Sequence, residues 1–262
     1  MSKHLRIWLF VILGTLLATT TLLAQGVITM TTSRAVGEEI GLSIKANGNV
    51  TIEGAQETSD YDTYTLTLTS QTVTIRGDVT ELDCRESQLT SLDVSKNTAL
   101  TRLVCFYNQL TSLDVSKNTA LKILACQDNQ LTSLDVPKNT ALEIIACQDN
   151  QLTSLDVSKN IALTKLLCSN NKLTSLNVSG CTRLTFIACT SNYINGQAMT
   201  KLVNSLPNRR EKSSGTLLVV DCSSQKRDRN RCSAADVTTA KRKNWKVLKD
   251  RGPYDWVSYS GD

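Results

Sequence analysis

Carboxylates that recur at a fixed spacing are the side chains of this sequence best suited to chemistry. One set consists of Asp93, Asp114, Asp135 and Asp156, and a second set of Asp128 and Asp149. A pair of carboxylates can hydrolyse a glycosidic bond, one as acid and the other as nucleophile or base. In the first set a lysine follows each aspartate after three residues. Repetition of a structural unit explains such regularity better than catalysis does.

Other catalytic signatures are missing from the sequence. The only histidine, His4, lies in the basic N-terminal start of the chain, so the rest of the chain has no imidazole for acid–base work. The sequence contains no glycine-rich phosphate loop and no serine nucleophile motif. We therefore expect no enzymatic activity, no catalytic residues and no cofactor.

Nine cysteines suggest disulfides or a metal site at first sight, but their spacing argues against both. Six of them lie 21 residues apart: Cys84, Cys105, Cys126, Cys147, Cys168 and Cys189. Stacked coils place Cβ atoms about 4.8 Å apart and pointing the same way. A disulfide needs about 3.8 Å and facing Cβ atoms. We expect a buried ladder of thiols that fills the core, without metal.

Cys222 and Cys232 flank a charged loop and are the candidate disulfide of the chain. Whether they are bridged stays open from the sequence.

The elements that position these side chains belong to one repeat. Leucines and cysteines keep the 21-residue period from Val79 to Asn192 without insertion, and such a period predicts a solenoid. Within the unit that starts at Leu100, apolar residues alternate at Leu103 and Cys105 and again at Leu113 and Val115. This alternation predicts two short parallel strands per coil and therefore two narrow parallel sheets.

Asparagines follow both expected strands and are predicted to form two inward ladders that bond the turn backbone. One ladder is Asn108, Asn129, Asn150, Asn171 and Asn192, and the other is Asn97, Asn118, Asn139 and Asn160.

The unit L-x-x-L-x-C-x-x-N-x-L-x-x-L-D-V-S-K-N-x-A resembles the leucine-rich repeat family over residues 79–192. The motif LDVSKNTALxxLxC is similar to repeat sequences of exported, internalin-like leucine-rich proteins of Bacteroidota-type bacteria. The resemblance implies a curved solenoid that binds proteins or other large ligands. Typical units of the family have a helical outer side, whereas these have a second expected strand. We therefore expect a straighter stack, a β-rich solenoid with two parallel sheets.

Four segments follow from these patterns. Residues 1–24 have a basic start, an apolar run and small residues, which predicts a cleaved signal peptide and leaves no membrane span. Residues 25–78 alternate as in four or five strands and are expected to cap the solenoid of residues 79–192. Residues 193–262 predict a mixed α/β C-terminal cap, with a helix at 197–206 and a capping box at Ser233–Asp236. An uncleaved membrane anchor is the alternative for the first segment.

Charge is unevenly distributed along a chain with a net charge of +5. Residues 79–192 hold ten basic and ten acidic residues, whereas residues 209–251 hold 13 basic and 5 acidic residues. The basic cap is either a solvated, mobile surface or a contact for anionic polysaccharide or lipid headgroups. The signal peptide argues against nucleic acid as a partner.

The candidate binding surface is the outward side of the first strand of each coil, because there the units differ while the opposite side repeats TSLDVSK. Variety with exposed apolar and aromatic residues is typical of interfaces, although β propensity alone also favours such residues. The candidate ligand-binding residues are Val104, Phe106, Tyr107, Ile123, Gln127, Asp128, Ile144, Gln148, Asp149, Leu167 and Phe186.

Two functions fit these observations. The first is an exported protein, secreted, periplasmic or on the cell surface, that binds a partner protein or a cell-surface ligand. The second is a structural component of the cell envelope without a specific soluble ligand.

Overall fold

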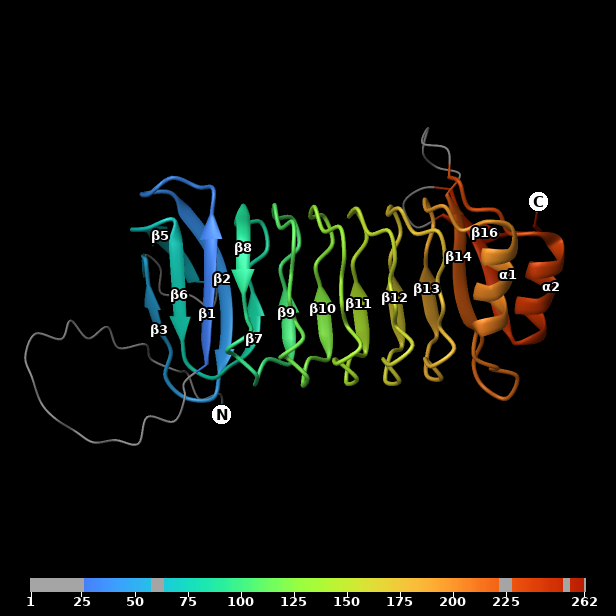
Figure 1. Ribbon diagram of the computed structural model, residues 1–262, viewed down its shortest axis with the longest axis horizontal. Helices are drawn as coiled ribbons and strands as arrows, with labels where there is room; N and C mark the ends of the chain where they lie inside the picture. The colour runs from blue at the N-terminus through green and yellow to red at the C-terminus, as the bar shows by residue number, and fades with distance from the viewer. Residues whose placement is uncertain (1–25, 58–63, 222–227, 252–254, 262) are drawn as a thin grey trace, which may run out of the picture.

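The computed structural model describes residues 26–57, 64–221, 228–251 and 255–261. The expected signal peptide, residues 1–24, lies outside the described residues. The chain forms one elongated, nearly straight stack of coils with a β-rich end and a mixed α/β end (Figure 1). The straight course agrees with the expectation from the 21-residue unit. No helix in these ranges is long and apolar enough to cross a membrane.

One long sheet runs the length of the stack and contains 12 strands. Its central strands are parallel, and each coil contributes one of them: β7 (Val79–Asp83), β9 (Arg102–Val104), β10 (Ile123–Ala125), β11 (Ile144–Ala146), β12 (Lys165–Leu167), β13 (Phe186–Ala188), β14 (Gly215–Asp221) and β15 (Trp245–Asp250). Residues 21 apart pair with each other from β7 to β13, for example Leu103 with Leu124. The sequence period is thus the register of the sheet, and the predicted solenoid is confirmed.

Alternation along each strand decides what enters the core. Leu124 and Cys126 of one coil have no exposed surface, and Ile123 and Ala125 between them are half-buried on the outward side. The ladder cysteines from Cys84 to Cys189 are all fully buried. Leucine, valine and cysteine thus form one apolar core along the stack.

The inner asparagine ladder closes each coil onto the preceding one. Asn129 Nδ2 donates to the carbonyl of Cys126 in its own coil, at 3.2 Å, and to that of Cys105 in the preceding coil, at 3.0 Å. Its Oδ1 accepts from the amide of Leu110 at 3.0 Å. Asn108, Asn150, Asn171 and Asn192 make the equivalent bonds. The predicted inner ladder is confirmed.

The outer asparagines are less completely bonded. Asn118 Nδ2 donates to the carbonyls of Val94 at 3.0 Å and Asn97 at 2.7 Å. The Oδ1 atoms of Asn97, Asn118, Asn139 and Asn160 are buried without a hydrogen-bond partner.

The predicted second parallel sheet is wrong. In the outer half of the coils from Leu110 onwards, the only pairing within the described residues is one isolated parallel bridge, Asp156 with Asn177. One backbone bond per coil remains there, such as the amide of Gln130 to the carbonyl of Leu110 at 2.9 Å. Local turns then take the next amides: Asp114 Oδ1 accepts from the amide of Ser116 at 2.8 Å. Aspartate competes with the ladder in this way because its short side chain reaches the backbone two residues on.

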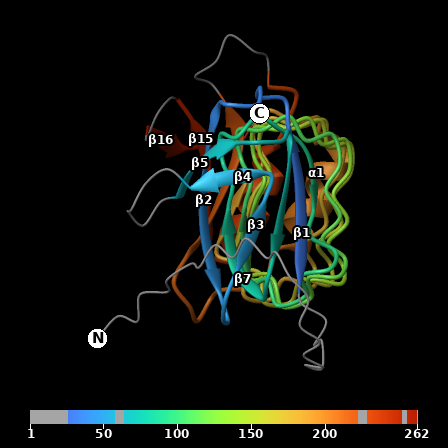
Figure 2. The same ribbon diagram turned by 90° about the vertical axis from the view of Figure 1, so that its left-hand side faces the viewer.

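The N-terminal cap consists of β1 (Val27–Thr32), β2 (Glu39–Ala46), β3 (Thr51–Glu53), β4 (Ala55–Glu57), β5 (Tyr64–Leu68) and β6 (Thr72–Arg76). It joins both sides of the first coil by antiparallel pairing. On the side of the long sheet, β2 pairs with β7. On the other side, β1 pairs with β8 (Leu89–Asp93) in a four-stranded sheet of order β3-β6-β1-β8. Figure 2, which views this end, shows β1 and β2 on opposite sides of the molecule.

The C-terminal end combines α1 (Gly196–Ser205), α2 (Ala234–Arg242) and β16 (Trp256–Ser258) with the last two parallel strands. The predicted helix after Asn195 is confirmed, and Met199, Leu202 and Val203 form its buried side. The predicted capping box is also present: the Ser233 hydroxyl accepts from the Asp236 amide, and the Asp236 carboxylate accepts from the Ser233 amide. These helices cover the end of the solenoid (Figure 1).

The inner ladder generates a test. Asn150→Ala removes the acceptor of the buried Leu131 amide and the donor to the carbonyls of Cys126 and Cys147. We expect a loss in free energy of unfolding of about 1–3 kcal/mol for each buried group left unpaired. Chemical denaturation measures this loss. Thr153→Ala, at an exposed site of the next coil half, is the control and should change stability by less than about 0.5 kcal/mol. Equal stability of both variants would contradict a structural role for the ladder.

Candidate functional site

The outward face of the parallel sheet carries the candidate site in four rows of residues, each row running from coil to coil. The first row contains Arg102, Ile123, Ile144, Lys165 and Phe186, and the second contains Val104, Ala125, Ala146, Leu167 and Ala188. The third row, after the strand ends, contains Arg85, Phe106, Gln127, Gln148, Ser169 and Thr190. The fourth contains Glu86, Tyr107, Asp128, Asp149, Asn170 and Ser191. The sheet register thus aligns the predicted residues along one side of the stack, and all of them except Val104 keep exposed surface there.

The middle of this surface is apolar. Ile123 and Ile144 are neighbours in register, and Ala146 is the register neighbour of Leu167. All four are half-buried on the outer side of the sheet. Alanines of the second row lie between the isoleucines of the first row and the glutamines of the third, and their short side chains project little from the sheet here. Gln127 and Gln148 each hold a buried Oε1 without a hydrogen-bond partner.

Val104 corrects the sequence interpretation. Its position in the repeat predicts an outward, accessible side chain, but only 2% of it is exposed although it does not belong to the core cluster. Its register neighbours are Asp83 and Ala125, and Asp83 holds the Arg85 side chain beside it. We attribute its burial to the Asp83–Arg85 pair on the outer side. Alternation fixes the direction of a side chain but not what lies over it.

An ion pair and two aromatic rings form a cluster at the N-terminal end of the face. Arg85 Nε donates to both carboxylate oxygens of Asp83, at 2.9 and 3.0 Å, and Arg85 Nη2 also donates to Oδ2. The Arg85 guanidinium lies 4.6 Å from the centroid of the Phe106 ring. Phe106 meets Tyr107 edge to face, with centroids 5.3 Å apart. Cation–π contact and paired charges hold this cluster in one arrangement.

The C-terminal end of the face carries a second aromatic contact. The Phe186 ring lies 5.8 Å from that of Trp256, which belongs to β16. The sequence interpretation missed Trp256 as part of this face. No periodic signal reports it, because β16 follows the last repeat and pairs antiparallel with β15. Part of the apolar surface of Phe186 is therefore used inside the molecule.

The fourth row has an unusual backbone. Its six residues have φ between 52° and 55°, in the left-handed region. Aspartate, asparagine and serine tolerate this region better than bulky residues do. Glu86 and Tyr107 are the exceptions, and Tyr107 is 56% exposed, so burial does not compensate for its conformation. Five of these residues stand immediately before an inner-ladder asparagine, and Glu86 stands before Ser87.

Asp128 and Asp149 occupy neighbouring places in this row. Burial, with a smaller contribution from the charge of Asp149, raises the pKa of Asp128 above its ordinary value. The outer carboxylates behave differently. Hydrogen bonds from Ser116 lower the pKa of Asp114, and bonds from Ser158 lower that of Asp156. Asp93, Asp114 and Asp156 are thus occupied with turn formation, whereas Asp135 is followed two residues on by Pro137, which has no amide hydrogen to donate.

The basic cap is partly built into the fold. Arg209 is 5% exposed, and its Nη1 donates to the carbonyl of Leu184 at 3.0 Å. Lys243 Nζ donates to the carbonyl of Leu206 at 2.9 Å, near the end of α1, and burial lowers its pKa. The interpretation of this region as a solvated, mobile surface is therefore wrong for Arg209, which is buried, whereas Lys243 is half-buried and bonds carbonyls of the cap.

The cysteine ladder consists of reduced, buried side chains. Burial raises the pKa of Cys126 to about 12 and raises those of its ladder neighbours as well. Cys181, which stands where other coils have an outer asparagine, donates from Sγ to the carbonyl of Val157. Cys222 lies outside the described residues, so the candidate pair with Cys232 stays a prediction.

No protein-family model and no curated protein sequence matches the chain. Among solved structures, the chain is similar to the functional domain of InlJ from Listeria monocytogenes, which includes a cysteine ladder. The two sequences are 29% identical, the match covers 67% of this chain and 50% of that chain, and the TM-score is 0.41. It is also similar to the internalin InlF of the same species, with 15% identity, 62% and 45% covered, and a TM-score of 0.48. A third is the leucine-rich repeat protein LIC12759 of Leptospira interrogans, with 16% identity, 65% and 48% covered, and a TM-score of 0.44. The chain matches about half the length of each of these proteins.

The buried thiols generate a test of reactivity. In the folded protein without reductant, we expect Cys105, Cys126, Cys147 and Cys168 to resist a thiol reagent, because a raised pKa and burial keep the thiolate scarce. All four should react in denaturant. Mass spectrometry of the labelled peptides measures both states. Disulfides between successive ladder cysteines would contradict the prediction.

Proposed function

We propose that this β-rich solenoid of leucine-rich repeats is an exported binding protein that attaches to a partner protein or to a cell surface through the outward face of the parallel sheet. The observation that carries the proposal is the contrast between the two sides of the stack. The outward face varies from coil to coil, whereas the opposite side repeats TSLDVSK almost unchanged.

The arrangement of the face supports this proposal. A central apolar stretch around Ile123, Ile144 and Leu167 lies between an aromatic cluster at each end. Asp128 and Asp149 provide a polar rim beside the stretch. Interfaces combine apolar cores with polar rims, and aromatic residues often carry most of the binding energy.

Tyr107 adds an argument from conformation. A tyrosine in the left-handed region is disfavoured, and most other coils place aspartate, asparagine or serine there. Unfavourable conformations of this kind concentrate where a side chain serves function. We infer that Tyr107, with Phe106, is an anchor for the partner.

Anionic polysaccharide binding by the basic cap is the weaker alternative. Arg209 and Lys243 bond carbonyls of the cap, and Arg210 Nε donates to the carbonyl of Arg242 at 2.7 Å. These hydrogen bonds show that the three side chains stabilise the cap itself. A purely structural role in the envelope is the other alternative.

The anchor generates a test with a variant taken from the protein itself. Phe106→Ser with Tyr107→Asn gives this coil the residues found at Ser169 and Asn170, which have the same backbone conformation at the second position. We expect the melting temperature to stay equal or rise, and binding to extracellular material of a host or partner cell to weaken more than tenfold. Loss of one anchor of about 2 kcal/mol has that effect.

Thr132→Ala with Ser133→Ala, exposed on the opposite side, is the matched control and should bind as the unchanged protein does. Binding that survives the aromatic change but falls steeply with salt assigns the contact to the basic cap. A protein that stays in the envelope fraction and retains no ligand in these assays contradicts the proposal and favours the structural role.

A further inference from the structure

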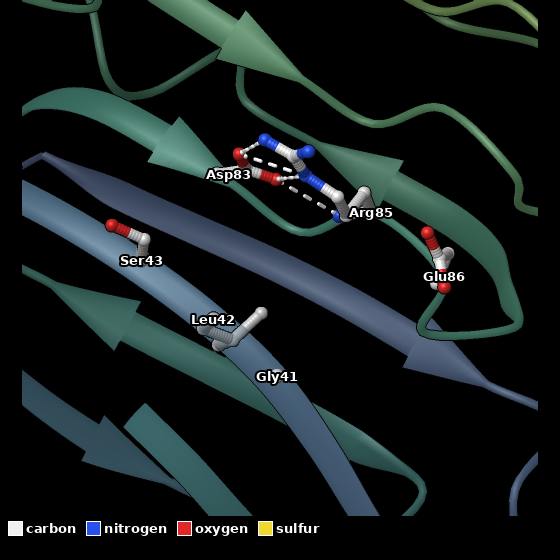
Figure 3. A pocket seen from close by; sticks show the side chains of 6 residues that line it. All are labelled: Gly41, Leu42, Ser43, Asp83, Arg85 and Glu86. Carbon is white, nitrogen blue, oxygen red and sulfur yellow. Dashed lines mark hydrogen bonds and ion pairs between the residues drawn. The ribbon is translucent and has the colours of Figure 1, made fainter. Parts of the chain in front are cut away.

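A cavity lies where the N-terminal cap meets the first coil, beside the proposed binding face. It has a volume of about 530 Å³ and is lined by Gly41, Leu42, Ser43, Asp83, Arg85 and Glu86. The volume is within the range of about 300–1,000 Å³ that is usual for small-molecule sites. Figure 3 shows Asp83 and Arg85 pointing toward each other above the strand that carries Gly41, Leu42 and Ser43.

The cavity lies where the pairing of β7 with one edge of β2 ends, while β5 pairs with the other edge of β2. Gly41 and Leu42 pair with β5, whereas Ser43 and the residues after it pair with β7. Beyond Asp83 the chain leaves β2 and turns toward the next coil, where the amide of Glu86 bonds the carbonyl of Phe106 at 3.1 Å. The space between the diverging segments stays open at Gly41, since a Cβ added there meets no atom within 4 Å.

The Asp83 carboxylate and the Arg85 guanidinium are held by each other and neutralise each other, and Glu86 adds one negative charge at the edge of the cavity. The Asp83 side chain is 19% exposed, and its two carboxylate oxygens accept hydrogen bonds from Arg85 Nε at 2.9 and 3.0 Å. Phe106 supports the guanidinium from one side at 4.6 Å. The pair therefore presents acceptors and donors together with little net charge. Such an array suits a neutral ligand that both donates and accepts, and it suits an ion less well.

An aromatic edge continues the cavity onto the binding face. Arg85 and Glu86 precede Phe106 and Tyr107 by one coil in their rows, and the Tyr107 side chain is 56% exposed. An exposed ring beside a fixed donor–acceptor array matches a molecule with one apolar face and polar edges. A sugar ring has both: its C–H face packs on an aromatic ring, and its neighbouring hydroxyls form paired hydrogen bonds.

We propose that this cavity is a binding site for a neutral saccharide, with sugar hydroxyls bound by Asp83, Arg85 and Ser43 and a sugar ring packed on Tyr107. The site shares Tyr107 with the protein contact proposed above and is otherwise separate from it. The serine hydroxyl and the Glu86 carboxylate complete the set of groups at its edge. In a fixed array, a sugar whose hydroxyls pair with these groups is favoured over an analogue that leaves the groups unpaired.

Gly41 provides a sharp test. Gly41→Leu adds a side chain on the cavity side of the strand, where a Cβ meets no atom within 4 Å, and the strand position requires no left-handed φ. We expect the melting temperature to stay equal or rise, because glycine weakens a strand. Ser112→Leu, at an exposed position on the opposite side, adds the same side chain away from the cavity and is the matched control.

The probes are maltohexaose, cellohexaose, laminarihexaose and chitohexaose, titrated into the purified chain by calorimetry at low and high salt. We expect at least one to bind saturably, with an affinity that salt does not change. Gly41→Leu should weaken this binding at least tenfold, Tyr107→Asn should weaken it less, and Ser112→Leu should leave it unchanged.

Three results would overturn the proposal: no saturable binding of any of the four sugars, full binding by Gly41→Leu, or displacement of the sugar by tetralysine with strong salt dependence. The last result would assign the cavity to a cationic side chain bound at Glu86. The protein contact is tested independently, since the Phe106→Ser, Tyr107→Asn double variant is read out by capture of a partner, and Gly41→Leu is expected to leave that capture unchanged.

Discussion

The stack depends on the hydrogen bonds that the buried side-chain amide of each inner-ladder asparagine makes. Each coil must turn immediately after its parallel strand, and the turn exposes carbonyls and amides to an apolar core. The Asn150 side chain pairs with carbonyls of two coils: its Nδ2 donates to the carbonyl of Cys126 in the preceding coil and to that of Cys147 in its own coil. A leucine or valine at the same place would bury the carbonyls without partners. The interaction therefore sets both the closure of one coil and its spacing from the next.

The left-handed row lies directly beside that closure. Five of its six residues precede an inner-ladder asparagine that points inward to bond the carbonyls behind it, and these five have φ between 52° and 54°, while Glu86, which precedes Ser87, has φ 55°. The side chains of the row are turned outward, at the edge of the parallel sheet. The same constraint that completes the core thus presents Tyr107, Asp128 and Asp149 to a ligand. Structure and candidate site share one turn, so a change of side chain in this row leaves the core bonds intact.

The sequence predicted what repetition controls and failed where contacts cross between different parts of the chain. The period predicted the parallel register, the buried cysteines and the inner ladder, since each of these repeats the same local chemistry. Alternation also predicted an outer sheet, but Asp114 bonds its own turn and removes the amide that a second ladder needs. Periodicity cannot report such competition between a side chain and a strand partner.

The candidate face shows the same division. Its residues and their direction followed from position within the unit, as for Ile123 and Ile144. The burial of Val104, the contact of Phe186 with Trp256 and the cavity beside Gly41 did not, because each depends on a pairing or a segment that the regular repeat does not contain. Strand pairing between the cap and the first coil is likewise a long-range event that no spacing encodes.

The identical register of successive coils also bears on how such a chain changes over generations. Each central coil touches only its two neighbours, and both caps meet the stack through the coils at its ends. Duplication or loss of the coding sequence for one repeat would move the two ends apart or together by one coil and leave every pairing of the same kind as before. The length of the outward face can thus evolve in whole steps, while the ends that protect it are inherited unchanged.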